Sequence, residues 1–104
     1  MTTPTLIAIL DFSTSSADRS VAVAQLQREQ PFVRSMPGCV RYRVFPSADT
    51  DTDITVVHEW TDPSSFADYL ASDAFARSGE VLRPLMTAPP SSRRFRADLI
   101  ETVA

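Results

Sequence analysis

The sequence contains no lysine, and among its 104 residues are only one cysteine, one histidine and one tryptophan. A single cysteine, Cys39, cannot form an internal disulfide, and no other cysteine or histidine stands at metal-ligand spacing. We therefore expect no structural zinc site and interpret Cys39 as a small apolar residue. The cytoplasm is the default location for a chain without a disulfide framework.

Long hydrophobic runs and basic clusters are also missing. The longest uninterrupted apolar run, Leu6 to Leu10, is far shorter than the ~20 residues that cross a bilayer. No basic segment precedes it, so we expect neither a secretory signal nor a membrane partner. The net charge is −3 and the sequence has no run of like charges, which argues against a nucleic-acid surface.

The length fits one globular domain over residues 1–104. A domain of this size removes only about two-thirds of its unfolded surface from water. Any large additional apolar face therefore needs a partner.

Four segments have the composition and alternation of strands: residues 5–12, 39–45, 54–60 and 94–103. Both faces of the first are apolar, with Leu6, Ala8, Leu10 and Phe12 on one side and Ile7 and Ile9 on the other. In the third strand, Ile54, Val56, His58 and Trp60 share one face.

Two helical regions lie between these strands. Residues 21–33 carry apolar positions at helical spacing, and we expect this helix to bend or restart at Pro31 and to stop before Gly38. Asp62 and Pro63 are typical of a helix start. The helical region that follows is predicted to break near Ser72 and to end at Pro84.

The element order β-α-β-β-α-β predicts an α+β fold of ferredoxin-like topology, with an antiparallel four-stranded sheet and helices on one face. The second face also looks apolar. We expect Leu10, Phe12, Val56 and Trp60 to lie on it and to be buried in a homodimer, sheet against sheet, around a shared barrel-like cavity.

Several short motifs between residues 37 and 85 are weak signals singly but characteristic in their order and spacing. A Pro-Gly pair precedes an aromatic-containing strand, the next strand ends at Trp60 before the acidic helix cap, and a Phe-x-x-Tyr-Leu-Ala-Ser helix follows. This combination resembles the antibiotic biosynthesis monooxygenase family of the dimeric α/β-barrel superfamily. The resemblance implies that two copies of the chain associate into a dimeric α/β barrel.

Members of that family oxidise aromatic polyketides or quinols with molecular oxygen, degrade haem, or have no known reaction. Haem-degrading relatives carry a strand Asn, a Trp and a helix His where this chain has Leu10, Trp60 and Tyr69. Only the Trp is retained, so haem breakdown is not expected. Anthrone-oxidising relatives have an Asn in place of Val56. Many others have a Glu where this chain has His58.

Oxidation of a phenolic ring by dioxygen requires the substrate as its anion, which passes an electron to oxygen more readily than the neutral phenol. We therefore expect His58 to be the catalytic proton acceptor near neutral pH, and Trp60 to stack on the substrate and donate a hydrogen bond. Tyr69 and an arginine, Arg43 or Arg41, could bind a phenolate or carboxylate. The other expected substrate-binding residues are Leu10, Phe12, Val56 and Phe66.

Three functions stay open at this point. The first is a small monooxygenase that needs no cofactor or uses a reduced flavin from a separate reductase. The second is a non-enzymatic dimer that binds a hydrophobic metabolite or assists a biosynthetic partner. The third is a cyclase or isomerase that uses the same cavity. In the plainer interpretation, His58 and Trp60 are core residues, and Arg41 and Arg43 belong to a solvated strand face.

Overall fold

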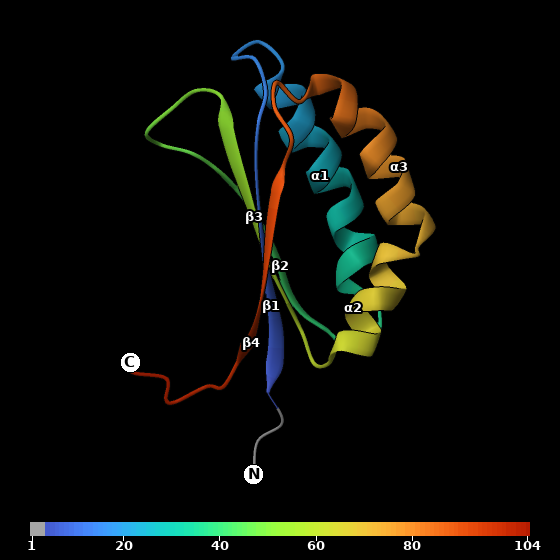
Figure 1. The fold of residues 1–104 in the computed structure, drawn as a ribbon, viewed down its shortest axis with the longest axis vertical. Coiled ribbons are helices and arrows are strands. Elements are labelled where there is room, and N and C mark those ends of the chain that lie inside the picture. The colour runs from blue at the N-terminus through green and yellow to red at the C-terminus, as the bar shows by residue number, and fades with distance from the viewer. Residues whose placement is uncertain (1–3) are drawn as a thin grey trace.

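The computed structural model describes residues 4–104 and contains four strands, three α-helices and one short 3-10 turn (Figure 1). In chain order these are β1 (Thr5–Ser13), α1 (Arg19–Arg34), β2 (Cys39–Pro46), β3 (Asp53–Trp60), α2 (Pro63–Leu70), α3 (Asp73–Leu82), η1 (Arg83–Leu85) and β4 (Ser91–Ala97). No helix among residues 4–104 is long and apolar enough to cross a membrane.

The four strands form one sheet in the order β2-β3-β1-β4, and every neighbouring pair is antiparallel. All three helices lie against the same side of this sheet, while the other side is open (Figure 1). The predicted ferredoxin-like architecture is confirmed. The second predicted helical region consists of two helices, since α2 ends at Leu70 and Ser72 caps the start of α3.

The side of the sheet that faces the helices, here called the covered face, contains the core. Burial alternates strictly along β3, where Ile54, Val56, His58 and Trp60 are buried and the residues between them are half-buried. On one side of β3, the register places Leu6, Ala8, Leu10 and Phe12 of β1 opposite these four residues; on the other side, Tyr42 and Val44 of β2 pair with His58 and Val56. Arg94 and Arg96 of β4 pair with Ala8 and Leu6 of β1 and so belong to the same face.

The prediction that Leu10, Phe12, Val56 and Trp60 lie on the uncovered side is therefore wrong. Trp60 is 0% exposed, and all four pack with or against the cluster that α1, α2 and α3 complete. Side chains two residues apart share a face, so the groupings read from the sequence were right. The sequence does not say which of the two apolar faces the helices cover.

The opposite side, here called the open face, is mixed in character. Its residues include Ile7, Ile9, Asp11, Arg41, Arg43, Thr55, Val57, Glu59, Arg93 and Phe95. Phe95 is 45% exposed, whereas Ile7, Ile9 and Val57 are half-buried. The second apolar stripe predicted on β1 is thus present, and charged residues flank it on both sides.

The helix boundaries follow the predicted capping residues closely. Asp62 accepts a hydrogen bond from the backbone N–H of Ser65 at 2.8 Å, which caps α2, and Pro63 occupies its first turn. The Ser72 hydroxyl accepts from the N–H of Phe75 at 3.2 Å and caps α3. Helix α1 runs through Pro31 without a break, contrary to one of the two predicted outcomes.

Gly38 shapes the connection between α1 and β2. Its φ angle of +85° lies in the left-handed region that side-chain-bearing residues rarely adopt. A Cβ atom there would also collide with the Ser65 side chain of α2. The Gly38 carbonyl accepts a hydrogen bond from the Thr61 N–H at 2.8 Å, so this glycine holds the start of β2 against the turn before α2.

The last strand is shorter than predicted. It ends at Ala97 rather than at Val103, because Ala97 pairs with Thr5, the first residue of β1, and nothing in β1 pairs with the chain beyond that point. The following residues turn away from the helices toward the open side (Figure 1). Leu99, Ile100 and Val103 in this tail are 75%, 95% and 80% exposed.

Candidate functional site

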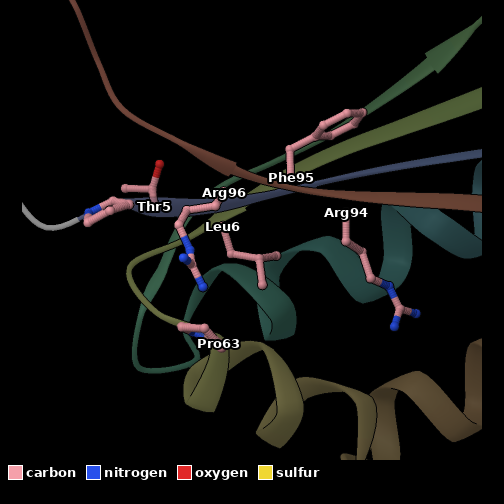
Figure 2. Close-up of a pocket in the computed structure, with 7 residues that line it drawn as sticks. Thr5, Leu6, Pro63, Arg94, Phe95 and Arg96 are labelled. Atoms are coloured by element: carbon pink, nitrogen blue, oxygen red, sulfur yellow. The ribbon is translucent and has the colours of Figure 1, made fainter.

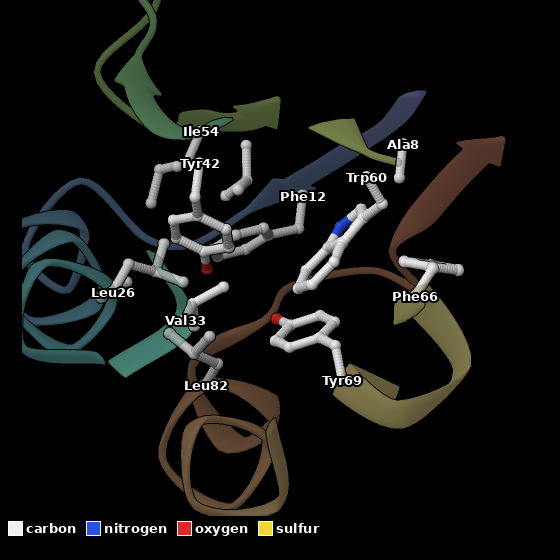
Figure 3. Close-up of a cluster of buried hydrophobic side chains, with 12 residues drawn as sticks. Ala8, Phe12, Leu26, Val33, Tyr42, Ile54, Trp60, Phe66, Tyr69 and Leu82 are labelled. Carbon is white, nitrogen blue, oxygen red and sulfur yellow. The ribbon is translucent and has the colours of Figure 1, made fainter. Parts of the chain in front are cut away.

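Five rings from three elements meet on the covered face and form a buried aromatic cluster, defined as Tyr42, His58, Trp60, Phe66 and Tyr69. The ring centres of Tyr42, Phe66 and Tyr69 lie 5.5, 5.6 and 5.6 Å from that of His58. Because α2 starts directly after β3, its residues three apart, Phe66 and Tyr69, both turn toward the sheet. Figure 3 shows Trp60 and Tyr69 side by side within the core.

A hydrogen bond inside this cluster fixes the state of the histidine. The indole N–H of Trp60 donates to Nδ1 of His58 over 2.8 Å. An indole nitrogen can only donate, so Nδ1 carries the lone pair and the proton of the neutral ring is on Nε2. No buried polar side-chain atom of residues 4–104 lacks a partner, and no hydrogen bond engages Nε2. Nε2 therefore keeps some contact with solvent, although His58 as a whole is only 5% exposed.

The environment keeps this imidazole neutral. Burial lowers the pKa of His58 from its ordinary value of 6.5 to about 4, and the nearby positive charge of Arg94 adds to the shift. A lowered pKa makes His58 a weak proton acceptor near neutral pH, which does not favour the expected role of general base. With Nδ1 already accepting a hydrogen bond, the ring is arranged to donate from Nε2 rather than to take up a proton.

The two tyrosines of the cluster are also uncharged at neutral pH. Burial raises the pKa of the Tyr69 hydroxyl, and it raises that of Tyr42 still further. Tyr69 stacks on Trp60 with ring centres 5.3 Å apart and planes inclined by 26°. Tyr69 can therefore donate a hydrogen bond, but it does not supply a negative charge or a base.

Arg94 of β4 reaches the aromatic cluster from the other side of β1. Ala8 of β1 pairs with His58 on one side and with Arg94 on the other, and all three point to the covered face. Ala8 between them is 0% exposed, so the space above its methyl group is filled by neighbouring side chains. The Arg94 guanidinium carbon lies 5.0 Å from the centre of the Phe66 ring, a cation-π contact.

A pocket of about 190 Å³ opens beside Arg94, between β1, β4 and the start of α2. We call it the arginine pocket; its lining residues are Pro4, Thr5, Leu6, Pro63, Arg94, Phe95 and Arg96. Figure 2 shows the side chains of Leu6, Arg94 and Arg96 extending toward α2, whereas Phe95 points to the opposite side of β4. His58 does not line this pocket, and Arg94 connects the pocket to the histidine.

The structure brings some of the predicted site residues together and separates others. His58, Trp60, Phe66 and Tyr69 are in mutual contact. Leu10, Phe12 and Val56 share the covered face but lie farther along the sheet, where they contribute to the core.

The arginines predicted from the second strand are not part of this site. Arg43 pairs with Val57, and Arg41 pairs with Glu59, so both point to the open face while Tyr42 between them points to the core. The prediction that Arg43 binds substrate beside His58 is wrong for this chain by itself. Alternation along β2 makes it geometrically impossible for Arg43 and Tyr42 to face the same side.

The arginines that lie on the covered face are Arg94 and Arg96 of β4, and neither was predicted as a site residue. The sequence pattern that could have revealed them is an arginine on each side of Phe95. Residues two apart on a strand point to the same face, so Arg94 and Arg96 share one. The neighbouring Arg93 hid this pattern, because three of the four residues from 93 to 96 are arginine.

Two observations bear on cofactors that the described residues could hold beside the aromatic cluster. Among residues 4–104, no three His, Cys, Asp or Glu side chains are grouped closely enough to hold a metal. The arginine pocket, at about 190 Å³, is below the ~300–1,000 Å³ of typical pockets for larger ligands. A whole flavin does not fit in it together with a substrate.

Fold and site together define a small α+β domain of ferredoxin-like topology with an aromatic, histidine-containing centre between sheet and helices. A family model described as antibiotic biosynthesis monooxygenase matches residues 5–80. The chain belongs to this family. The match ends before β4, so Arg94 and Arg96 lie outside the matched segment.

Solved structures share this fold over nearly their whole length. The chain is similar to Rv0793 from Mycobacterium tuberculosis, with a TM-score of 0.84, 20% identity and coverage of 95% of this chain and 99% of that one. SO0527 from Shewanella oneidensis gives a TM-score of 0.83, 20% identity and coverage of 91% and 92%.

A protein from Nitrosomonas europaea, assigned as an antibiotic biosynthesis monooxygenase, gives a TM-score of 0.87 at 12% identity and covers 93% of each chain. A comparison with curated proteins finds no match. At these identities the structural likeness establishes the fold, and function has to be argued from the site.

Proposed function

We propose that the protein is a small monooxygenase that oxidises an aromatic, polyketide-type or quinol substrate with molecular oxygen. The observation that carries this proposal is the neutral His58, oriented by Trp60 and enclosed by aromatic rings, with Arg94 beside it. Family membership supports the class of reaction, because monooxygenases give the family its name.

The proposed reaction needs no metal when the substrate supplies all the electrons. In an anthrone-type substrate, a ring CH2 group becomes C=O. One oxygen atom of O2 enters the product and the other leaves as water, and the four electrons that reduce O2 come from the substrate carbon. A phenolate or enolate form is required first, since its charge makes electron transfer to oxygen favourable.

The site favours that anionic form by stabilising charge. The Nε2–H of His58 can donate to the substrate oxygen, and the Arg94 guanidinium places a positive charge on the same side of the sheet. A nearby cation lowers the pKa of a phenol, so the proton can leave to water without a protein base. The rings of Trp60 and Tyr69 are buried and stack on each other, so they hold His58 in position rather than presenting a free surface to the substrate, as had been expected of Trp60.

We also propose that the protein acts as a homodimer formed through the open face. This face presents Arg41, Arg43 and Arg93 beside Glu59 and Asp11, so a two-fold copy can place opposite charges against each other. Phe95 is exposed, and the tail after β4 turns toward the same side and contains the exposed Ile100, so both can supply apolar area for such a contact.

Oxygen uptake with anthrone and with a quinol tests the proposed activity. We expect uptake that depends on the protein, with one O2 consumed for each anthrone converted to quinone. His58→Ala should lower the turnover number by about 10²–10³, the usual loss when one anion-stabilising donor is removed. Arg28→Gln, on the exposed side of α1 and away from the proposed dimer face, is the control and should leave turnover unchanged.

Other results would support the other functions. Tight binding of aromatic ligands without any oxygen uptake would favour an accessory binding protein. Product formation without oxygen uptake would indicate a cyclase or isomerase. Uptake only after a reduced flavin is supplied would make the enzyme flavin-assisted.

A further inference from the structure

Two arginines on one strand face the same pocket without an acidic partner. Arg96 pairs with Leu6 and Arg94 pairs with Ala8, so they stand two residues apart on the covered face of β4. Both guanidinium groups extend toward α2 and line the arginine pocket (Figure 2). Both side chains are exposed to solvent, so their charges are hydrated and remain accessible to an anionic ligand.

The acidic side chains near this pocket are engaged elsewhere. No Asp or Glu lines the pocket, and the ion pairs within residues 4–104 are Arg77–Glu29 and Arg93–Asp11. Asp62, just before Pro63, accepts hydrogen bonds from the Ser65 backbone, the Ser65 hydroxyl and the Thr61 hydroxyl. Glu59 is on the open face, where it accepts from Thr5.

Arg93 shows what an arginine of this strand does when it is structural. It points to the open face and pairs with the Asp11 carboxylate at 3.5 Å. The Arg94 side chain instead lies over the Phe66 ring and extends from β4 toward the helices. One strand therefore carries both a paired arginine and two arginines available to a ligand.

Apart from Thr5, the remaining lining of the pocket is apolar. Leu6 and Pro63 form its sides, and Phe66 lies under Arg94. A volume of about 190 Å³ suits a small ring system with an acidic substituent, not a long or branched chain. The two arginines would then bind the acidic group, and the apolar residues would pack against the ring.

We propose that Arg94 and Arg96 form a carboxylate-binding subsite, so that the substrate of this protein is an aromatic acid whose carboxylate sits in the arginine pocket. Identification of the bound acid as a substrate rests on the proposed oxygenase function; the subsite itself does not. Arg94, which lies beside both His58 and the pocket, sets the orientation. With the carboxylate bound at these guanidinium groups, the ring lies against the apolar lining that Leu6 and Pro63 provide.

Calorimetric titration with 2-naphthoate and 2-naphthamide tests the subsite. The two probes have nearly the same shape and differ in charge. We expect the acid to bind the native protein about 10- to 100-fold more tightly than the amide, as for charge-assisted hydrogen bonds to a carboxylate. Arg94→Gln and Arg96→Gln should each reduce this preference, and the double variant should abolish it.

Arg93→Gln is the matched control, because it removes the same charge from the opposite face of the same strand. It should keep the preference for the acid, and circular dichroism should show that all variants are folded. Equal binding of acid and amide to the native protein, no binding of either, or an equal loss in Arg93→Gln would overturn the proposal. The titration involves no oxygen, so a failed oxygenase assay would leave a positive binding result standing.

Discussion

Trp60 donates its indole N–H to Nδ1 of His58, two residues earlier on the same strand, across 2.8 Å. The pair lies on the covered face, where Tyr42, Phe66 and Tyr69 enclose it. A residue spacing of two on a strand is what allows this contact, because both side chains leave the sheet in the same direction. The hydrogen bond assigns the proton of the neutral imidazole to Nε2, and with it the direction in which His58 can act.

Replacing Trp60 by Phe should raise the pKa of His58. The variant removes the donor that holds the Nδ1 lone pair, so protonation at Nδ1 no longer breaks a hydrogen bond. It should also destabilise the fold by roughly 1–3 kcal/mol, since a buried acceptor is left unpaired. A titration of the single histidine by NMR measures the first effect and urea denaturation measures the second. Phe66→Leu, which leaves the hydrogen bond in place, should not raise the pKa in the same way.

Stability should fall on acidification as His58 is protonated in the unfolded chain. The pKa is 6.5 in an unperturbed histidine and about 4 in the folded protein, so between these values only the unfolded chain takes up the proton. This difference removes on the order of 3 kcal/mol of stability between pH 7 and pH 4. Urea denaturation of the native protein and of His58→Gln at both pH values isolates the histidine contribution.

The His58→Gln variant should lose less stability than the native protein over that range, while the carboxylates contribute similarly to both. The same lowered pKa predicts that turnover does not rise through pH 6–7, because His58 is already neutral there. An activity profile with a half-maximal point near pH 6.5 that disappears in His58→Gln would contradict the assigned protonation state.

Gly38→Ala should destabilise the protein by at least about 1–2 kcal/mol. Its φ of +85° is strained for alanine, and the new methyl group meets the Ser65 side chain. Gly79→Ala is the matched control. Its Cβ would meet only the flexible end of Arg83, at 3.4 Å, and alanine favours the helix by up to about 1 kcal/mol. Thermal unfolding should therefore shift in opposite directions for the two variants.

Light scattering in dilute buffer should give twice the 11.5 kDa mass of the chain. We expect truncation after Ala97 to weaken this assembly, because it removes Leu99, Ile100 and Val103 from the open side. Replacing Glu59 by Lys should weaken it too, by putting like charges together. A native protein that stays monomeric at micromolar concentration would exclude the homodimer.

The sequence by itself determined the element order and most of the boundaries. The strand patterns of residues 54–60 and the caps at Asp62 and Ser72 are local features, and local hydrogen bonding and alternation are sufficient to define them. The same alternation showed that His58 and Trp60 share a face. The positive φ of Gly38 was likewise expected from its place after a helix.

Only the tertiary structure decided which face of the sheet the helices cover, and so where the site lies. Both faces of β1 are apolar, so its sequence pattern fits either arrangement, and the choice depends on how the helices pack against the whole sheet. Long-range pairing also brings Arg94 across Ala8 to His58, residues that are far apart in the chain. Strand register is a property of the assembled sheet, which is why the arginine of the site lies on the last strand and not on the second.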